Sequence, residues 1–271
     1  TGEHLMQYGA MNFPVKPIFS EIEEIAAFEF DYLELSMDAP LAHYAIIEQQ
    51  KNEILNALAR HSLGLVCHLP CFVFTADLTE SIRMASLNEM LNSLDVVSEL
   101  KVRKAILHPS IISGLGMYAM DLSLKYAFES LDAITAKADE LGIVLGLENM
   151  FPRYQTCYET GSFIDIFNRY PNLKLTLDTG HANIGSLDGR RALEFIERLG
   201  HRLAHLHVSD NLGKRDDHFP IGQGNHDFKA IISALKYTGY NDTVTFEVFA
   251  EDRHQMQASK EKFEAMVAAT D

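Results

Sequence analysis

Leu203-Ala-His-Leu-His-Val-Ser-Asp-Asn211 is the stretch that decides the fold, because a short apolar run in it ends abruptly in polar residues. A second stretch, Leu173-Lys-Leu-Thr-Leu-Asp-Thr-Gly-His181, has the same form. Short runs of this kind, rich in β-branched residues or leucine, are typical of buried strands. A longer segment with helical spacing of apolar residues separates such runs from one another. The pattern therefore predicts parallel strands whose carboxyl ends carry polar side chains.

The same kind of run occurs eight times along the chain. The predicted strands are Met6–Phe13, Tyr32–Met37, Gly64–Pro70, Lys104–Ser110, Ile143–Met150, Leu173–His181, Leu203–Asn211 and Thr243–Phe249. Eight alternations of strand and helix predict the α/β class and a single (β/α)8 TIM barrel that spans residues 1–271 as one domain. An open, doubly wound sheet is the main alternative, but no G-x-G-x-x-G motif follows the first strand.

The composition excludes several classes of protein. With 47% hydrophobic and 23% charged residues, the chain is globular rather than disordered or fibrous. No apolar run reaches the ~18 residues of a membrane span, and the amino terminus shows no signal peptide. The three cysteines form no C-x-x-C pair, so a cytoplasmic location is expected. The net charge of −15 disfavours nucleic acid and acidic membranes as partners.

Active sites of such barrels form where the carboxyl ends of the strands meet. The polar residues at these ends are Glu34, His68, His108, Glu148, Asp178, His181, His207 and Glu247. One such residue alone is usually an ordinary solvated loop residue, but several carboxylates at one barrel mouth repel each other unless a cation lies between them. The pattern predicts a divalent metal, with Zn or Mn favoured and Mg, Co or Fe open. His205 shares a strand face with His207 and is expected to be an interior residue.

The loop after the seventh strand, residues 210–225, contains further candidates. Asp216 and His218 are possible ligands of a second cluster. Lys214 and Arg215 are cations that an anionic substrate would meet. An ordinary charged surface loop is the alternative, although loops of this length in compact domains tend to be functional.

These motifs, in this order from Glu34 to Glu247, resemble the xylose-isomerase-like barrel superfamily. It includes sugar isomerases, ketose 3-epimerases, dehydratases and apurinic-site nucleases of the endonuclease IV type. In its epimerases one metal is held by four residues, which match Glu148, Asp178, His207 and Glu247. In its nucleases three zinc ions have additional ligands, which match His68, His108, His181, Asp216 and His218. The resemblance thus implies between one and three ions, with His68, His108, Asp216 and His218 expected to form a second, optional site.

Two enzymatic functions compete. The favoured one is a metal-dependent sugar or sugar-phosphate isomerase or epimerase, in which Glu148 and Glu247 relay the proton of a metal-stabilised enediolate. Glu34, His181 and Arg215 would then bind oxygens of the carbohydrate substrate. The alternative is an endonuclease IV-like, zinc-dependent phosphodiesterase, but 23 basic against 38 acidic residues do not favour tight binding of duplex DNA. A barrel that only binds a ligand is a third possibility, against which the full ligand set argues. The sequence leaves open whether the protein forms a homo-oligomer.

Overall fold

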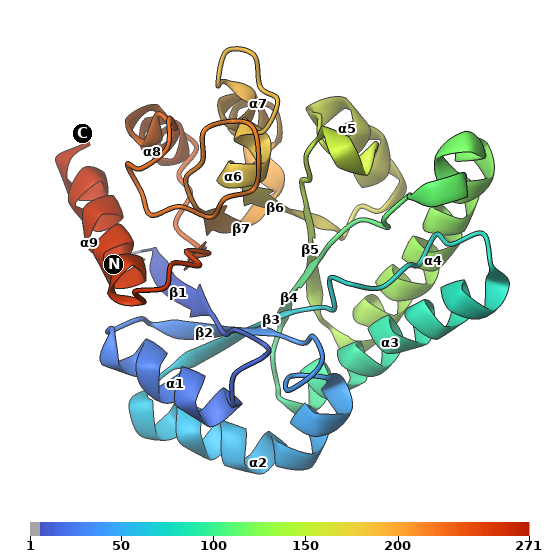
Figure 1. The fold of residues 1–271 in the computed structure, drawn as a ribbon, viewed down its shortest axis with the longest axis horizontal. Coiled ribbons are helices and arrows are strands. Elements are labelled where there is room, and N and C mark those ends of the chain that lie inside the picture. Colours follow the sequence, from blue (N-terminus) through green and yellow to red (C-terminus); the bar gives the residue numbers. More distant parts are fainter. Residues whose placement is uncertain (1–5, 271) are drawn as a thin grey trace.

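In the computed structural model, which describes residues 6–270, eight parallel strands close into a barrel (Figure 1). The strands are β1 (Gln7–Met11), β2 (Tyr32–Ser36), β3 (Gly64–His68), β4 (Lys104–Leu107), β5 (Val144–Glu148), β6 (Lys174–Asp178), β7 (Leu203–Val208) and β8 (Thr243–Phe246). Each strand pairs with its neighbours in chain order, and β8 closes the barrel on β1. The predicted α/β class and (β/α)8 TIM barrel are therefore confirmed.

Helices between the strands form the outer ring. They are α1 (Ile18–Ala27), α2 (Tyr44–His61), α3 (Glu80–Glu99), α4 (Met120–Leu141), α5 (Thr160–Arg169), α6 (Thr179–Asn183), α7 (Arg191–Leu199), α8 (Phe228–Tyr237) and α9 (His254–Ala269), with 3-10 turns η1 (Gly114–Tyr118), η2 (Pro152–Tyr154) and η3 (Gly200–Arg202). Their apolar residues recur on one side, so that Ile47, Ile54 and Leu58 of α2 are buried. Among the described residues, no helix has both the length and the apolar character that crossing a membrane requires.

The barrel interior is filled in layers, because alternate residues of each strand point inward. Tyr32, Val66 and Ile106 form a small apolar cluster of their own. The Tyr32 ring occupies the space that a side chain at Gly9 would need, since a Cβ there would lie 2.2 Å from the ring. Further along most of the strands, the next inward position is a histidine or a carboxylate. The fold therefore collects polar side chains at the carboxyl ends of the strands.

The predicted strands are right in number and order but too long at their carboxyl ends. The sequence pattern predicts the sixth as Leu173–His181, whereas β6 ends at Asp178 and α6 begins at Thr179. Asp178 caps this helix, because its Oδ1 accepts a hydrogen bond from the backbone N–H of His181 at 2.6 Å. A hydrophobic pattern cannot separate the last residues of a strand from a polar first turn of helix, which explains the error.

Candidate functional site

A group of four buried side chains lies at one end of the barrel. Glu148 and Asp178 end β5 and β6, His207 lies in β7, and Glu247 directly follows β8. The Nδ1 atom of His207 is 3.1 Å from Glu247 Oε1, 3.4 Å from Glu148 Oε1 and 3.9 Å from Asp178 Oδ2. Four adjacent strands therefore bring four donor atoms to one place. We call these four residues the donor cluster.

The chemistry of the donor cluster fits a divalent cation. Glu148 Oε1, Asp178 Oδ2 and His207 Nδ1 are buried and have no hydrogen-bond partner among the described residues. Unpaired buried polar atoms cost free energy, and in native structures they mark a missing partner. Carboxylate oxygens and an imidazole nitrogen are donors that both Zn²⁺ and Mn²⁺ accept. Several sets of three side chains that include members of the donor cluster have ligand atoms close enough to one another to hold one ion.

Glu34 orients His207 from the interior side. Its two oxygens lie 3.0 Å from His207 Nε2 and 2.8 Å from His205 Nε2. Burial disfavours the charge on Glu34, but the two histidines outweigh it and hold the pKa of this carboxyl well below its usual range. A carboxylate in this position turns the other nitrogen of His207 toward a metal. The predicted role of Glu34 as a substrate ligand has no support in its position, because the side chain is fully buried and both oxygens are engaged. His205 is an interior residue, as expected.

His68 and His108 lie together beside Glu148. Their Nε2 atoms are 3.3 Å and 3.0 Å from Glu148 Oε2. The Nδ1 of His68 is 2.9 Å from the backbone carbonyl of Leu69. A proton on that nitrogen leaves Nε2 free to accept, which is the form a metal ligand needs. Glu148 is therefore shared between this pair and the donor cluster.

A second pair of histidines lies beside Asp216. Asp216 Oδ2 is 3.2 Å from His181 Nε2 and 3.0 Å from His218 Nε2. As in His68, the Nδ1 atoms are held by backbone carbonyls, of Asn149 at 2.9 Å for His181 and of Glu247 at 3.0 Å for His218. The four residues predicted to form one second site therefore make their contacts in two places. The structure joins His68 and His108 to Glu148, but Asp216 and His218 to His181.

Arg215 lies away from these clusters. Its side chain is 84% exposed, and its guanidinium is paired at 3.8 Å with Asp217 of the same loop. No described contact joins it to the donor cluster, so its predicted role as a substrate ligand has no support in its position. In this loop the side chain of Asp216 turns inward and that of Arg215 does not. The sequence of the loop does not indicate this difference.

The two carboxyl groups predicted to move protons differ in acidity. Burial disfavours the charge on Glu148, but His108 and His207 outweigh it and hold the pKa of this carboxyl well below its usual range. Burial, together with the charges of Asp178 and Glu148, raises the pKa of Glu247 to about 7. Two carboxyl groups whose pKa values are pushed apart are typical of acid–base sites.

Sequence reasoning missed Asn149, which fixes Asp178 and His181. Its Oδ1 accepts from the backbone N–H of Asp178 at 2.7 Å, and its Nδ2 donates to the carbonyl of Asp178 at 3.0 Å. Its own carbonyl accepts from His181. The sequence feature that could have identified Asn149 is its position directly after Glu148, at the end of a strand whose other residues are apolar.

The chain belongs to the family of xylose isomerase-like TIM barrels, which it matches over residues 22–269. The uncharacterized protein MJ1311 of Methanocaldococcus jannaschii is 28% identical over 252 residues, which make up 89% of this chain and 83% of that protein. A D-tagatose 3-epimerase-like protein of known structure is 26% identical, with a TM-score of 0.87 over 98% of both chains. Two further structures share the fold. The 3-keto-D-glucoside 4-epimerase YcjR from E. coli is 19% identical, with a TM-score of 0.77 over 96% of this chain and 99% of that one. The TTHB071 protein from Thermus thermophilus is 22% identical, with a TM-score of 0.74 over 98% and 100%.

Proposed function

We propose that this protein is a metal-dependent isomerase or epimerase of sugars or sugar phosphates. The observation that carries the proposal is the donor cluster, in which three carboxylates converge on His207 Nδ1. Membership of the family and the likeness to a D-tagatose 3-epimerase-like protein support it. The TTHB071 crystal soaked with ZnCl2 supports a metal in a barrel of this fold.

Glu148, Asp178, His207 and Glu247 would hold the ion. When bound, a divalent ion supplies polarisation of a carbonyl and a neighbouring hydroxyl oxygen, and so acidifies the C–H bond between them. Glu148 is ionised at neutral pH and would take up the proton. Glu247, the second of the two carboxyl groups, would return a proton to the sugar. His181, at the edge of the cluster, would bind a hydroxyl group of the sugar through Nε2, the nitrogen that faces Asp216.

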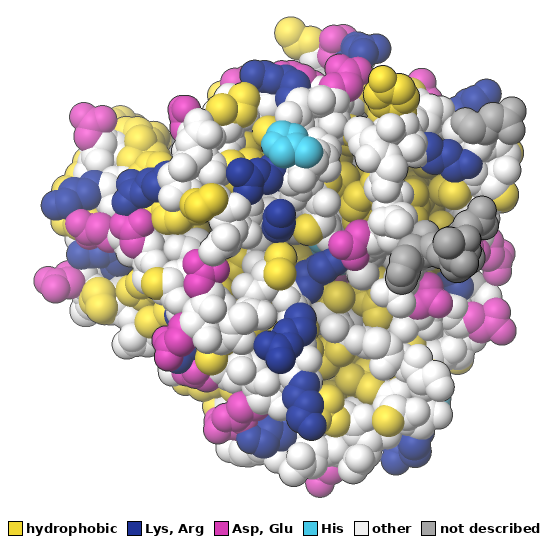
Figure 2. Space-filling view, turned by 180° about the vertical axis from the view of Figure 1, so that it is seen from behind, with side chains coloured by type: hydrophobic (Ala, Val, Ile, Leu, Met, Phe, Trp, Pro, Cys, Tyr) yellow, Lys and Arg dark blue, Asp and Glu magenta, His cyan; other side chains and the backbone are white. Residues whose placement is uncertain are grey.

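A second candidate function rests on the two histidine pairs. His68 and His108 at Glu148, and His181 and His218 at Asp216, offer two more cation positions beside the donor cluster. Several adjacent ions suit the hydrolysis of a phosphodiester, as at an apurinic site in DNA. The net charge of −15 weakens this candidate. On the face shown in Figure 2, basic side chains are interspersed with acidic, apolar and neutral ones.

Exchange of a sugar C–H hydrogen for deuterium from the solvent distinguishes an isomerase or epimerase from a phosphodiesterase. Metal-loaded protein is incubated in D2O with ketohexoses and their phosphates, and the label in the recovered sugars is read by NMR. We expect deuterium on the carbon beside the carbonyl, and its loss in Glu148→Gln and Glu247→Gln. Asp217→Asn, which changes an acidic residue of the loop outside the cluster, is the matched control. Hydrolysis breaks no C–H bond, so incision of an abasic duplex without label in any sugar would make the nuclease the better assignment.

Metal analysis tests how many ions are held. One ion per chain, retained in His68→Ala and His108→Ala, agrees with the epimerase arrangement. Two or three zinc ions, reduced in these variants, favour the hydrolase. If the variants changed neither metal content nor activity, His68 and His108 would have a structural role alone.

A further inference from the structure

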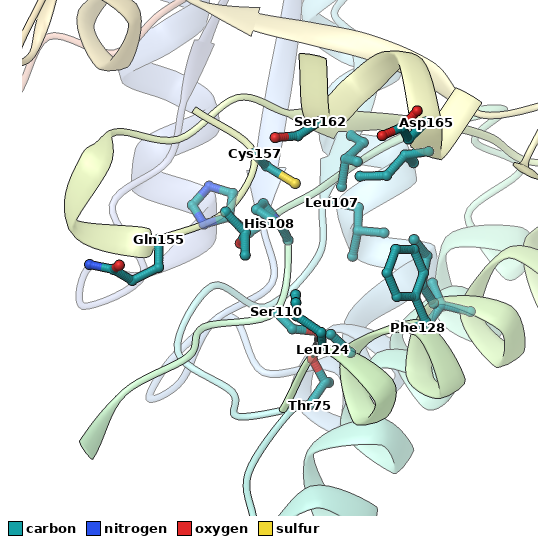
Figure 3. A pocket seen from close by; sticks show the side chains of 17 residues that line it. Thr75, Leu107, His108, Ser110, Leu124, Phe128, Gln155, Cys157, Ser162 and Asp165 are labelled. Atoms are coloured by element: carbon teal, nitrogen blue, oxygen red, sulfur yellow. Dashed lines mark hydrogen bonds between the residues drawn. The ribbon is translucent and has the colours of Figure 1, made fainter. Parts of the chain in front are cut away.

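A cavity separates α4 from α5 on the outer side of the barrel (Figure 3), and its volume is about 320 Å³. Several neighbouring helices of the ring pack on each other, as α3 does on α4 and α5 on α7, but the backbones of α4 and α5 hardly approach each other. Leu107 of β4 and Leu147 of β5 line the cavity from the barrel side. Its size is that of a small-molecule site.

The side chains that line the cavity are mostly apolar, with polar groups from the loops and from α5. Leu124, Phe128 and Leu131 of α4 and Ile166 of α5 are among the apolar ones. The loops after β3, β4 and β5 contribute Thr75, His108, Ser110, Gln155 and Thr156, and α5 contributes Ser162 and Asp165. Unfilled apolar space of this kind leaves dispersion contacts unmade and favours an apolar occupant.

The charges in the lining limit the occupant further. No lysine or arginine lines the cavity within residues 6–270, and the acidic side chain in its wall is Asp165. A carboxylate or phosphate entering here would lose its water without gaining a cation, beside a like charge. A neutral molecule avoids both costs.

His108 connects the cavity with the donor cluster. Its Nε2 is 3.0 Å from Glu148 Oε2, while its Nδ1 is buried and has no hydrogen-bond partner among the described residues. Since Nε2 faces the carboxylate, Nδ1 is the nitrogen that lacks a partner, and Ser110 and Gln155 line the cavity together with His108. A hydroxyl group both donates and accepts, so it suits the hydroxyl, amide and imidazole groups of this end in either protonation form of the ring.

We propose that this cavity binds a neutral amphiphile, with its apolar chain between α4 and α5 and a hydroxyl group at His108. The site is separate from the donor cluster, but His108 lines it and also faces Glu148 of that cluster. Its binding does not depend on which reaction the donor cluster catalyses.

Unbranched primary alcohols are the probe. Binding is measured by calorimetry or by ligand-observed NMR from 1-butanol to 1-heptanol. Each buried methylene should strengthen binding about fourfold until the cavity is full. Heptanoate should bind on the order of tenfold more weakly than 1-heptanol, because its carboxylate would lose water without gaining a cation from the lining. Affinity that is independent of chain length, or no saturable binding, would refute the site.

Cavity-filling variants locate the binding. Ala127→Phe from α4 and Ser162→Phe from α5 should each abolish it, whereas Ala136→Phe, at an exposed position of the same α4, should leave it unchanged. Unchanged binding in both filled variants would overturn the proposal. If these variants do not fold, a crystal of the wild type soaked in 1-heptanol decides. Density between α4 and α5 supports the proposal, and an empty cavity contradicts it.

Discussion

Two layers of polar side chains lie inside the barrel. They contain the same residue types but differ in whether their polar atoms have hydrogen-bond partners. In the lower layer, His205 bonds through Nδ1 to Thr243 at 2.7 Å and through Nε2 to Glu34 at 2.8 Å, and the other oxygen of Glu34 bonds to His207. In the upper layer, buried atoms of Glu148, Asp178 and His207 lack partners among the described residues. Among the histidines and carboxylates, pairing rather than residue type therefore distinguishes an internal network from a candidate ligand site.

The largest effect is expected from Glu148→Gln in the upper layer. The rate of deuterium exchange should fall by about a thousandfold or more, because the change removes both a ligand oxygen and a proton acceptor. Thermal unfolding in the presence of a chelator should occur at a lower temperature, because His108 and His207 stabilise the ionised carboxylate that the change removes. A variant that keeps most of its exchange rate would remove Glu148 from the proposed mechanism.

Glu34→Ala in the lower layer should act mainly on stability. The change leaves His205 and His207 without their buried partner, so the free energy of unfolding should fall by about 3–5 kcal/mol. Urea denaturation with a chelator present measures this loss. The affinity for metal should also fall, by about 10- to 100-fold, because His207 is no longer oriented. Unchanged unfolding would show that the lower layer contributes little to the fold.

A smaller effect is expected from pH through His205. Burial lowers the pKa of His205 to about 4 from its ordinary value of 6.5, although Glu34 opposes the shift. The neutral ring therefore contributes stability that is present above pH 6.5 and is lost as the pH falls through about 4, up to roughly 3 kcal/mol. The urea midpoint without metal should decline less over this range in His205→Gln than in the wild type. Parallel declines in the two proteins would contradict this interpretation.

The comparison of the layers also shows what the sequence could and could not predict. The number and order of the strands, and the polar residues near their ends, follow from local patterns. The depth of each residue depends on register between strands, which a pattern does not contain. Glu34 pairs with Val66, whereas Ser36 pairs with His68, so Glu34 lies one layer below the level of His68. This is why a residue expected to bind substrate instead supports a histidine.

The cavity beside α4 was beyond prediction for a related reason. Helical spacing identifies the residues that face the barrel, such as Leu131 and Ile134 on α4. It does not tell how far one helix stands from the next, because that distance depends on the side chains and loops of both. A gap between two helices therefore cannot be recognised from the amino-acid pattern of either helix.

The backbone carbonyls that hold His68, His181 and His218 have a consequence for how such a site can change over evolutionary time. A carbonyl is the one acceptor that every residue keeps when it is substituted. Leu69 can become another residue and still accept the hydrogen bond from His68. The imidazole rings thus keep their orientation while the side chains around them vary. A lineage can in this way exchange substrates without first rebuilding the histidines that face them.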